Sequence, residues 1–272
     1  MFNTIGIITK PQDITSQETA RELGAFLKQK DVSLVENEKD IEKNADLIIV
    51  VGGDGSILST ARTYVDSNIP ILGINLGRLG FLADVSVESM MTVVSDILSG
   101  EYIKEERALL SCQVEREGNI LFQHLAFNEV VVHRNETPRM IEFELFVDGD
   151  FVNKQRADGM IVTTPTGSTA YALSSGGPIM HPSVNTICLV SISPHTMSHR
   201  PFILHGESEV LISLIDSDDK ATVSFDGQAF FSILLGDSLR VRQHDNFIHL
   251  IHPKGYDYFK IIRSKLHWGH KV

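Results

Sequence analysis

The stretch LIIVVGGDGSIL, residues 47–58, decides how the first third of the chain folds. Its first five residues are apolar and rich in Ile and Val, which is typical of a strand covered on both faces of a parallel sheet. The glycine-rich turn GGDG follows directly, and the apolar residues Ile57, Leu58 and Ala61 open a helix after it. A strand, a tight turn and a helix in this order predict one repeat of an α/β domain.

The same alternation extends to both sides of this stretch. Further apolar strands are expected at residues 5–8, 32–35 and 69–74. A helix is expected between the first two strands with Ser16 as its N-cap, and another helix runs from Met90 until Gly100 ends it. We therefore expect residues 1–103 to form a Rossmann-like α/β domain with a parallel sheet.

The pattern of the chain changes near residue 104, where helical periodicity gives way to short β-rich runs. Asp148-Gly149 and Asp226-Gly227 are hairpin signals, and one helical segment is expected around residues 169–175. We predict a mostly antiparallel β-rich domain over residues 104–250, a ligand cleft between the two domains, and a segment 251–272 that packs back on the first. The β-rich runs are residues 110–114, 126–132, 141–147, 160–163, 189–192, 210–214, 222–225, 232–235, 239–242 and 247–251.

Composition limits the possible partners. The chain has 272 residues with 24 Lys and Arg against 35 Asp and Glu, so its formal charge is −11. Such a balance argues against binding to a nucleic-acid polymer, which needs basic residues to displace counterions from phosphates. The two cysteines cannot form a disulfide framework and are expected to be buried thiols. With no secretory signal and no apolar run near the ~20 residues of a membrane span, we expect a cytoplasmic protein without a membrane partner.

The GGDG turn is suited to phosphate. Gly52, Gly53 and Gly55 let the backbone approach an anion, and the unpaired N–H groups at a helix start can bind it. Asp54 would repel phosphate unless it accepts a proton from a hydroxyl or meets the phosphates through a divalent cation. Both interpretations favour phosphoryl transfer, and a tight turn capped by Asp54 is the alternative. A P-loop motif is missing, as is a G-x-G-x-x-G after the first strand.

A second glycine-rich turn, GINLGRLGFL at residues 73–82, follows the next strand. Glycine turns at the carboxyl ends of neighbouring parallel strands are expected to form one crevice, where open α/β sheets bind ligands. Phe81 packs either against a ligand ring or into the core.

Three clusters in the β-rich domain carry polar groups. Asn128-Glu129 interrupts an apolar run and, if buried, needs partners such as ribose hydroxyls, whereas at a strand edge both side chains would be solvated. Arg156 and Asp158 lie two apart, on one side of an extended chain, and a surface ion pair is the usual explanation. TPTGSTAY, residues 164–171, offers hydroxyl donors without positive charge for phosphates or a ribose, or forms a simple turn.

His249 with His252, and His267 with His270, have i,i+3 spacing, but no ligand pattern completes a metal site.

Taken in order, the motifs resemble the NAD kinase family. The resemblance covers nearly the whole chain, and the later motifs distinguish this family from the diacylglycerol, sphingosine and phosphofructokinase-like enzymes that share GGDG alone. The matching motifs are GGDG at 52–55, GINLGRLGFL at 73–82, NE at 128–129, DG at 158–159, TPTGSTAY at 164–171, GGP at 176–178, PHT at 194–196, RP at 200–201 and LIHP at 250–253.

The resemblance implies ATP-dependent phosphorylation of the 2′-hydroxyl of the adenosine ribose of NAD, giving NADP, with a divalent cation that is usually Mg²⁺. It implies a homodimer or homotetramer and feedback by NADP(H). Asp54 would be the catalytic base, Gly55 would lie beside the substrate, and Phe81 would line the adenine side. Asn128 and Glu129 would hold ribose hydroxyls. The remaining implied contacts are Arg156 and Asp158 to the second nucleotide half, the substrate-binding segment residues Thr169, Ala170, Tyr171 and Ser174, and the less distinctive positions Arg139 and Gln228.

Two other functions compete with this interpretation. The first is a lipid or sugar kinase of the same superfamily, against which the GINLGRLGFL turn counts. The second is a non-catalytic dinucleotide sensor, which would have no need of the base at Asp54.

Overall fold

The computed structural model describes residues 2–268 except 11, 78–79, 136–138 and 218–219. Two compact units make up the chain. The first comprises residues 1–106 together with 248–272, and the second comprises residues 107–247.

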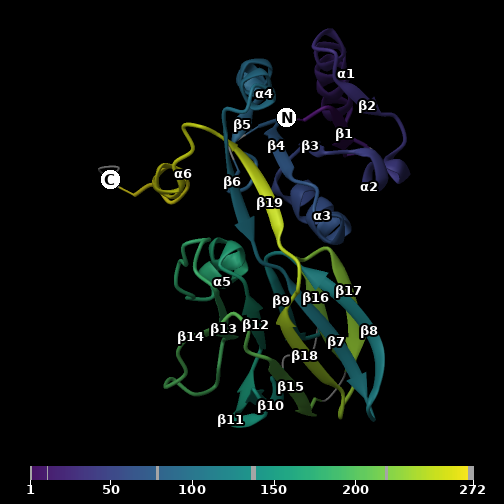
Figure 1. Cartoon of the computed structure of the whole chain (residues 1–272). Helices are drawn as coiled ribbons and strands as arrows, with labels where there is room; N and C mark the ends of the chain where they lie inside the picture. Colours follow the sequence, from purple (N-terminus) through teal and green to yellow (C-terminus); the bar gives the residue numbers. More distant parts are fainter. Residues whose placement is uncertain (1, 11, 78–79, 136–138, 218–219, 269–272) are drawn as a thin grey trace. The chain divides into compact units, whose positions relative to one another are not determined.

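The first unit is built on a largely parallel sheet with the strand order β2-β1-β3-β4-β19-β6, and β5 pairs with β4 (Figure 1). β3 is buried at all five positions, as expected of a strand covered on both faces. The Rossmann-like α/β prediction is therefore confirmed. The strands are β1 Thr4–Thr9, β2 Ser33–Val35, β3 Leu47–Val51, β4 Ile71–Asn75, β5 Val85–Ser86, β6 Tyr102–Arg107 and β19 Ile248–Pro253, and the helices are α1 Ile14–Gln29, α2 Ile41–Asn44, α3 Asp54–Tyr64, α4 Met90–Leu98 and α6 Tyr258–Lys265, with 3₁₀ turns at Glu38–Asp40, Val65–Ser67 and Val87–Ser89.

One hydrophobic core of this unit lies between the sheet and the helices α1 and α4. It contains Ile49 and Ile74 from the strands, Leu23 from α1 and Val94 from α4, together with Ile251 from β19. The final part of the chain therefore contributes directly to this core, since Leu250 and Ile251 pair in parallel with β4.

The predicted N-cap of α1 is wrong. Asp13 caps the helix, because its Oδ1 accepts the Ser16 N–H at 3.0 Å. Ser16 is fully buried inside the first turn, and its hydroxyl donates instead to the Val51 carbonyl at 2.6 Å.

The second unit is a β-sandwich of two antiparallel sheets. Their strand orders are β11-β10-β15-β18-β7-β8 and β14-β13-β12-β9-β16-β17. Alternate residues of both sheets, such as Val130 and Val132 of β9, point into one shared core. The predicted β-rich fold is confirmed. The strands are β7 Leu110–Arg116, β8 Asn119–Ala126, β9 Glu129–Arg134, β10 Ile141–Val147, β11 Asp150–Ala157, β12 Gly159–Thr163, β13 Thr186–Ile192, β14 Phe202–His205, β15 Val210–Asp216, β16 Ala221–Phe225, β17 Ala229–Ile233 and β18 Ser238–Gln243.

Both Asp-Gly hairpin predictions are correct. Asp148 and Gly149 have φ of 52° and 87° between β10 and β11, and Asp226 and Gly227 have φ of 52° and 63° between β16 and β17. The tight second turn starts β17 at Ala229, so the strand expected at residues 232–235 lies three residues earlier. The expected helical segment is a 3₁₀ turn, Thr166–Thr169, followed by α5, Tyr171–Ser174.

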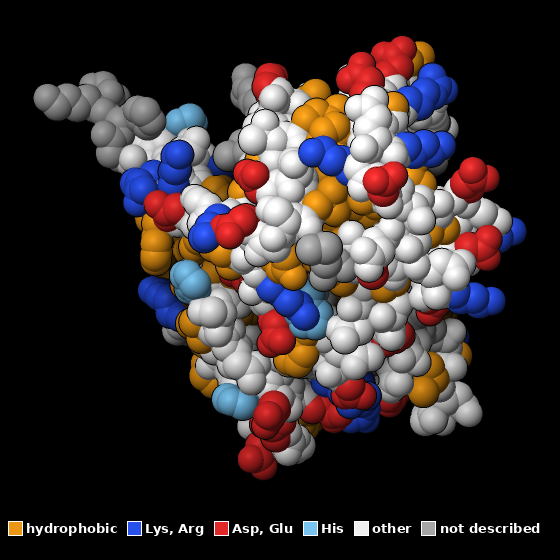
Figure 2. All heavy atoms as spheres, turned by 45° about the horizontal axis from the view of Figure 1, so that its top comes forward, with side chains coloured by type: hydrophobic (Ala, Val, Ile, Leu, Met, Phe, Trp, Pro, Cys, Tyr) orange, Lys and Arg blue, Asp and Glu red, His pale blue; other side chains and the backbone are white. Residues whose placement is uncertain are grey.

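Both cysteines are buried free thiols, as expected. None of the helices in the described part of the chain is long and apolar enough to cross a membrane. On the face shown in Figure 2, Lys and Arg side chains lie scattered among Asp and Glu rather than in one broad basic area.

Candidate active site

The GGDG turn connects β3 to α3, and α3 begins at Asp54. Gly53 and Gly55 are exposed, so the positive end of the α3 dipole faces solvent. A Cβ at Gly53 would meet nothing within 4 Å, whereas one at Gly52 would lie 2.7 Å from Ser56 Oγ. The turn thus combines an open helix start with a carboxylate at its first position.

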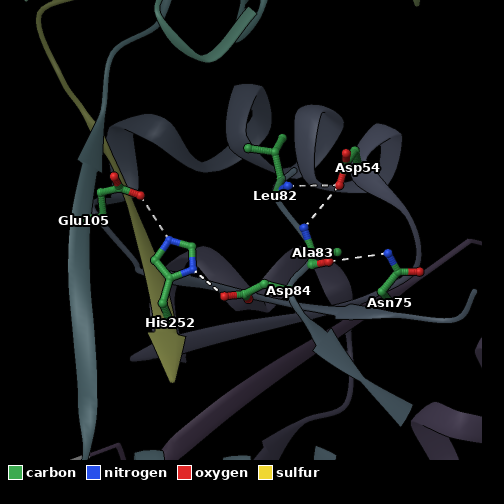
Figure 3. A network of polar contacts seen from close by, with 7 residues as sticks. All are labelled: Asp54, Asn75, Leu82, Ala83, Asp84, Glu105 and His252. Atoms are coloured by element: carbon green, nitrogen blue, oxygen red, sulfur yellow. Dashed lines mark hydrogen bonds and ion pairs between the residues drawn. The ribbon is translucent and has the colours of Figure 1, made fainter. Parts of the chain in front are cut away.

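The Asp54 carboxylate is wrapped by the second glycine turn. Its Oδ2 accepts the Phe81 N–H at 2.8 Å. Its Oδ1 accepts the Leu82 and Ala83 N–H groups, each at 3.1 Å, and Figure 3 shows these two contacts. The two turns follow the neighbouring strands β3 and β4, and they meet around this side chain as the sequence predicts. Arg78 and Leu79 of the second turn lie outside the described residues.

Gly80 permits this close approach. A Cβ at this position would lie 1.9 Å from Asp54 Oδ1, so no other residue fits while the carboxylate stays in place. An ionised carboxylate has about four acceptor positions, and three are occupied by the turn. One acceptor position therefore remains for a hydroxyl proton.

Phe81 is only partly buried and is not in the cluster that packs against α1 and α4. Lys265 of α6 places its Nζ 5.9 Å from the centre of the Phe81 ring. The ring thus remains available to a ligand, although its backbone N–H already serves Asp54.

In the second unit, Asp226 makes a similar arrangement at the entry of β9. Its carboxylate accepts the N–H groups of Phe127, Asn128 and Glu129 at 2.9, 2.7 and 3.1 Å. The sequence marks Asp226 only as a hairpin residue, so its role at this site was missed. Its left-handed φ of 52° is what turns the carboxylate of a β16–β17 hairpin residue toward another strand.

Glu129 is buried, with 6% of its surface exposed, which excludes a solvated strand edge for this residue. Its Oε2 has no hydrogen-bond partner within the described part of the chain. Burial, followed by the negative charge of Asp226, raises the pKa of Glu129 to about 8 against the effect of a hydrogen bond from the Tyr171 backbone. At neutral pH Glu129 is therefore mainly a neutral acid that can donate a hydrogen bond.

A pocket of about 550 Å³ lies over the outer face of β9. Glu129, Val131 and His133 alternate along the strand and form its floor, while Tyr171 of α5 stands beside it. Of the predicted site residues, Glu129, Asp158 and Tyr171 line it. The full lining is Glu129, Val131, His133, Arg134, Asn135, Asp158, Tyr171, Ile192, Ser224, Asp226 and Gly227.

The other predicted residues of this unit are not in that lining. Gln228 directly follows the lining residue Gly227, and Asn128 precedes Glu129. Arg139, Arg156, Ser174 and Gln228 are exposed, and Asn128, Thr169 and Ala170 are partly buried.

Asp158 forms an ion pair with Arg134, at 2.6 Å, and not the expected pair with Arg156. The backbone explains this difference, because the Arg134 N–H also donates to the Asp158 carbonyl at 2.9 Å where β9 and β12 pair. Arg134 is a pocket residue that sequence reasoning missed.

Several hydroxyls of the 164–171 segment hold the turn itself. The Thr164 hydroxyl donates to the Phe127 carbonyl at 2.7 Å, and the Ser168 hydroxyl donates to Pro165 at 2.6 Å. Both side chains are buried, so the expectation that they face a phosphate or a ribose is wrong for these two. They instead fix the segment that carries Tyr171.

Comparisons with known proteins place this geometry in a family. Residues 33–102 match the ATP-NAD kinase N-terminal domain and residues 127–253 match the ATP-NAD kinase C-terminal domain. The chain belongs to the NAD kinase family. A NAD kinase of Hydrogenovibrio crunogenus is 45% identical over the full length of both chains. A NAD kinase of Aromatoleum aromaticum is 48% identical over 86% of this chain and 78% of its own.

Solved structures agree with this membership. A yeast NADH kinase complexed with NADH superposes with a TM-score of 0.91 at 26% identity, covering 99% of this chain and 89% of its own. An Archaeoglobus fulgidus NAD kinase in complex with ATP superposes with a TM-score of 0.79 at 26% identity, covering 97% and 98%. A lipid kinase, a sugar kinase and a sensor are not favoured by any of these comparisons.

Proposed function

We propose that the chain transfers the terminal phosphoryl group of ATP to the 2′-hydroxyl of the adenosine ribose of NAD, giving NADP and ADP. The kinase activity follows from family membership, and Asp54 is the residue assigned to the chemistry. The ribose oxygen forms the new bond to phosphorus while the bond from phosphorus to the ADP oxygen breaks. The hydroxyl proton passes to Asp54.

The observation that carries this assignment is the anchoring of Asp54 by three backbone N–H groups. Phosphoryl transfer asks a protein chiefly for positioning and for stabilisation of charge. A carboxylate fixed at the start of a helix, with one acceptor position left over, supplies an oriented proton acceptor without a mobile side chain.

In the second unit, we assign the pocket over β9 to a nucleoside part of the substrate. Neutral Glu129 would donate a hydrogen bond to a ribose oxygen, which would also satisfy its buried Oε2. Tyr171, Asp158 and the pocket volume support this assignment, since ligand pockets range over about 300–1,000 Å³.

The residues also fit a divalent cation that is held mainly by substrate phosphates. No group of three potential ligands occurs in the described ranges, whereas Mg²⁺ commonly binds through one or two carboxylates, phosphates and water. Its ligands would then be mainly phosphate oxygens and water, because the acceptor position that the turn leaves on Asp54 is assigned to the hydroxyl proton. When bound, the cation would neutralise charge on the phosphates.

We also infer a cytoplasmic homodimer or homotetramer. Large apolar side chains on the edge strands β14 and β17, namely Phe202, Ile203 and Phe230, are each about half exposed in the single chain and support self-association. Size-exclusion chromatography coupled to light scattering measures the molar mass in solution, and the mass of a monomer would refute this inference.

A coupled assay for NADP formation from NAD, ATP and Mg²⁺ tests the function, with Asp54→Asn as the matched variant. We expect the variant to lose most of kcat while it still binds NAD in a calorimetric titration. Loss of binding instead would make Asp54 a substrate-holding residue. The absence of NADP formation by the wild-type protein would refute the function itself.

A further inference from the structure

Behind the turn that holds Asp54, the side chain of His252 lies between two carboxylates (Figure 3). Its Nδ1 is 2.9 Å from Asp84 Oδ2, and its Nε2 is 3.1 Å from Glu105 Oε2. The side chains of His252, Asp84 and Glu105 are only 1%, 6% and 16% exposed. They come from β19, the turn before β5, and β6, so three segments of the first unit meet at one ring.

This geometry identifies the charge on the ring. A neutral imidazole has one N–H and one lone pair, so either tautomer would turn a lone pair toward a carboxylate oxygen. An imidazolium donates to both. Burial lowers the pKa of His252, but the hydrogen bonds and negative charges of Asp84 and Glu105 outweigh burial and raise that pKa above its usual value. Tyr256 stacks on the ring at 3.8 Å, which also favours a cation.

The cluster is joined directly to the turn around Asp54. Asp84 follows Ala83, whose N–H donates to Asp54 Oδ1 and whose carbonyl accepts from Asn75 Nδ2 at 3.4 Å. The other oxygen of Asp84, Oδ1, is buried and has no hydrogen-bond partner among the residues that the structure describes. Among the described residues, the hydrogen bond from His252 Nδ1 is therefore the contact that holds the Asp84 carboxylate in place.

We propose that His252, as an imidazolium bonded to both carboxylates, is a positioning residue for phosphoryl transfer, because it fixes Asp84 and with it the turn at residues 80–83 that orients Asp54. The proposal rests on the proposed function, since it assigns His252 to the reaction that Asp54 serves. His249, on the same strand, differs in that its partner is Glu106, whose side chain is 69% exposed.

The proposal has a definite pH sense. The titratable groups that face His252 are Asp84 from the turn, Glu105 from β6 and Tyr256 after β19. The Lys254–Glu101 ion pair joins the residue after β19 to the residue before β6. Loss of the proton would leave one carboxylate against a lone pair and loosen the turn. We therefore expect kcat to fall as the pH rises through the raised pKa of His252, with the KM for NAD little changed.

Two variants separate the two contacts. The amide nitrogen of Asn takes the place of Nδ1 and that of Gln takes the place of Nε2, so His252→Asn keeps a donor toward Asp84 and His252→Gln keeps one toward Glu105. We expect His252→Gln to lower kcat by about 10-fold or more, since loosening the turn misplaces the base. His252→Asn should lose less kcat than His252→Gln. In both variants the fall of kcat at high pH should be absent, whereas the control His249→Asn should keep the wild-type dependence of kcat on pH.

Hydrogen exchange of the segment 80–84, followed by mass spectrometry, gives a readout that does not depend on activity. Faster exchange there in His252→Gln, but not in His249→Asn, is the expected result. Any of three results would overturn the positioning role. They are a fall of kcat at high pH in both His252 variants as in the wild type, equal losses of kcat in His252→Gln and His252→Asn, and unchanged exchange of residues 80–84. If the wild-type chain makes no NADP, the proposed function fails while exchange still tests the turn. If the variants do not fold, the hydrogen exchange of residues 80–84 is measured in the wild-type protein at pH 6 and at pH 9 and corrected for the intrinsic exchange rates. Equal protection of this segment at the two pH values would refute the proposal.

Discussion

Replacing Gly80 with alanine tests how strongly the reaction depends on the position of Asp54. The new Cβ would lie 1.9 Å from Asp54 Oδ1, 2.7 Å from its Cγ and 2.9 Å from its Oδ2. Real Cβ atoms essentially never come within 3.0 Å of another heavy atom, so Oδ1 must retreat by about 1 Å.

That movement has two consequences. The Leu82 and Ala83 N–H groups bond to Oδ1 at 3.1 Å, and a retreat of about 1 Å takes these distances beyond hydrogen-bond range. Losing two bonds to a charged group costs about 3 kcal/mol of stability. A catalytic group misplaced by about 1 Å costs about 100-fold in rate, so we expect kcat to fall about 100-fold with the KM for NAD within a fewfold of wild type.

Gly77 in the same turn provides the control. A Cβ there meets nothing within 4 Å, and its φ is not left-handed, so Gly77→Ala should keep most of the activity. The measurements are kcat and KM in the coupled NADP assay and the midpoint of urea unfolding. A Gly80→Ala enzyme with wild-type kcat, or a Gly77→Ala enzyme with an equal loss, would refute the displacement of Asp54 as the cause.

Three further outcomes follow from the second unit and from the cation. Because folding raises the pKa of Glu129 to about 8, the folded state holds more protons than the unfolded one from about pH 4.5 to 8, so wild-type stability falls as pH rises through that window. Glu129→Gln should remove up to about 5 kcal/mol of this fall. Melting temperatures of the wild type and the variant that change in parallel from pH 5 to 9 would contradict this expectation. Asp226→Asn should lower the unfolding free energy by about 2 kcal/mol in urea titrations, because it weakens acceptance of three N–H groups. Asp148 lies at the same kind of turn, but its carboxylate accepts one N–H group among the described residues, that of Glu209 at 2.8 Å, so Asp148→Asn should cost under about 1 kcal/mol. Excess EDTA should abolish NADP formation and added Mg²⁺ should restore it, and a full rate in EDTA would exclude the cation we propose.

The fold could be predicted well where one local pattern determined it. The five buried residues of β3 and the two Asp-Gly hairpins are such cases. β8 and β11 were missed because most of their residues are exposed or partly buried, and their longest apolar runs, residues 120–122 and 151–152, are short. The hairpin between β7 and β8 turns at Glu117-Gly118, with φ of 50° and 79°, where no Asp or Asn marks it.

The site was predictable in its motifs but not in its partners. Asp54, Glu129 and Tyr171 stand in recognisable motifs, whereas the ion pair of Asp158 with Arg134 depends on the register between β9 and β12. The bonds of His252 reach 168 residues back to Asp84 and 147 residues back to Glu105. No spacing rule connects such positions, because the place of β19 between β4 and β6 in the sheet is what brings them together.

The place of β19 in the sheet has a consequence for how the protein is made. β19 lies between β4 and β6, yet it is synthesised only after the whole second unit, residues 107–247. Until then, β4 presents an open edge to other nascent chains and β6 has no neighbour, which is a setting for misassembly that chaperones guard against. Since His252 arrives on this same strand, a chain that stalls before residue 248 would possess the whole GGDG turn and still lack its support. Catalytic competence would then come only after the second unit has been made.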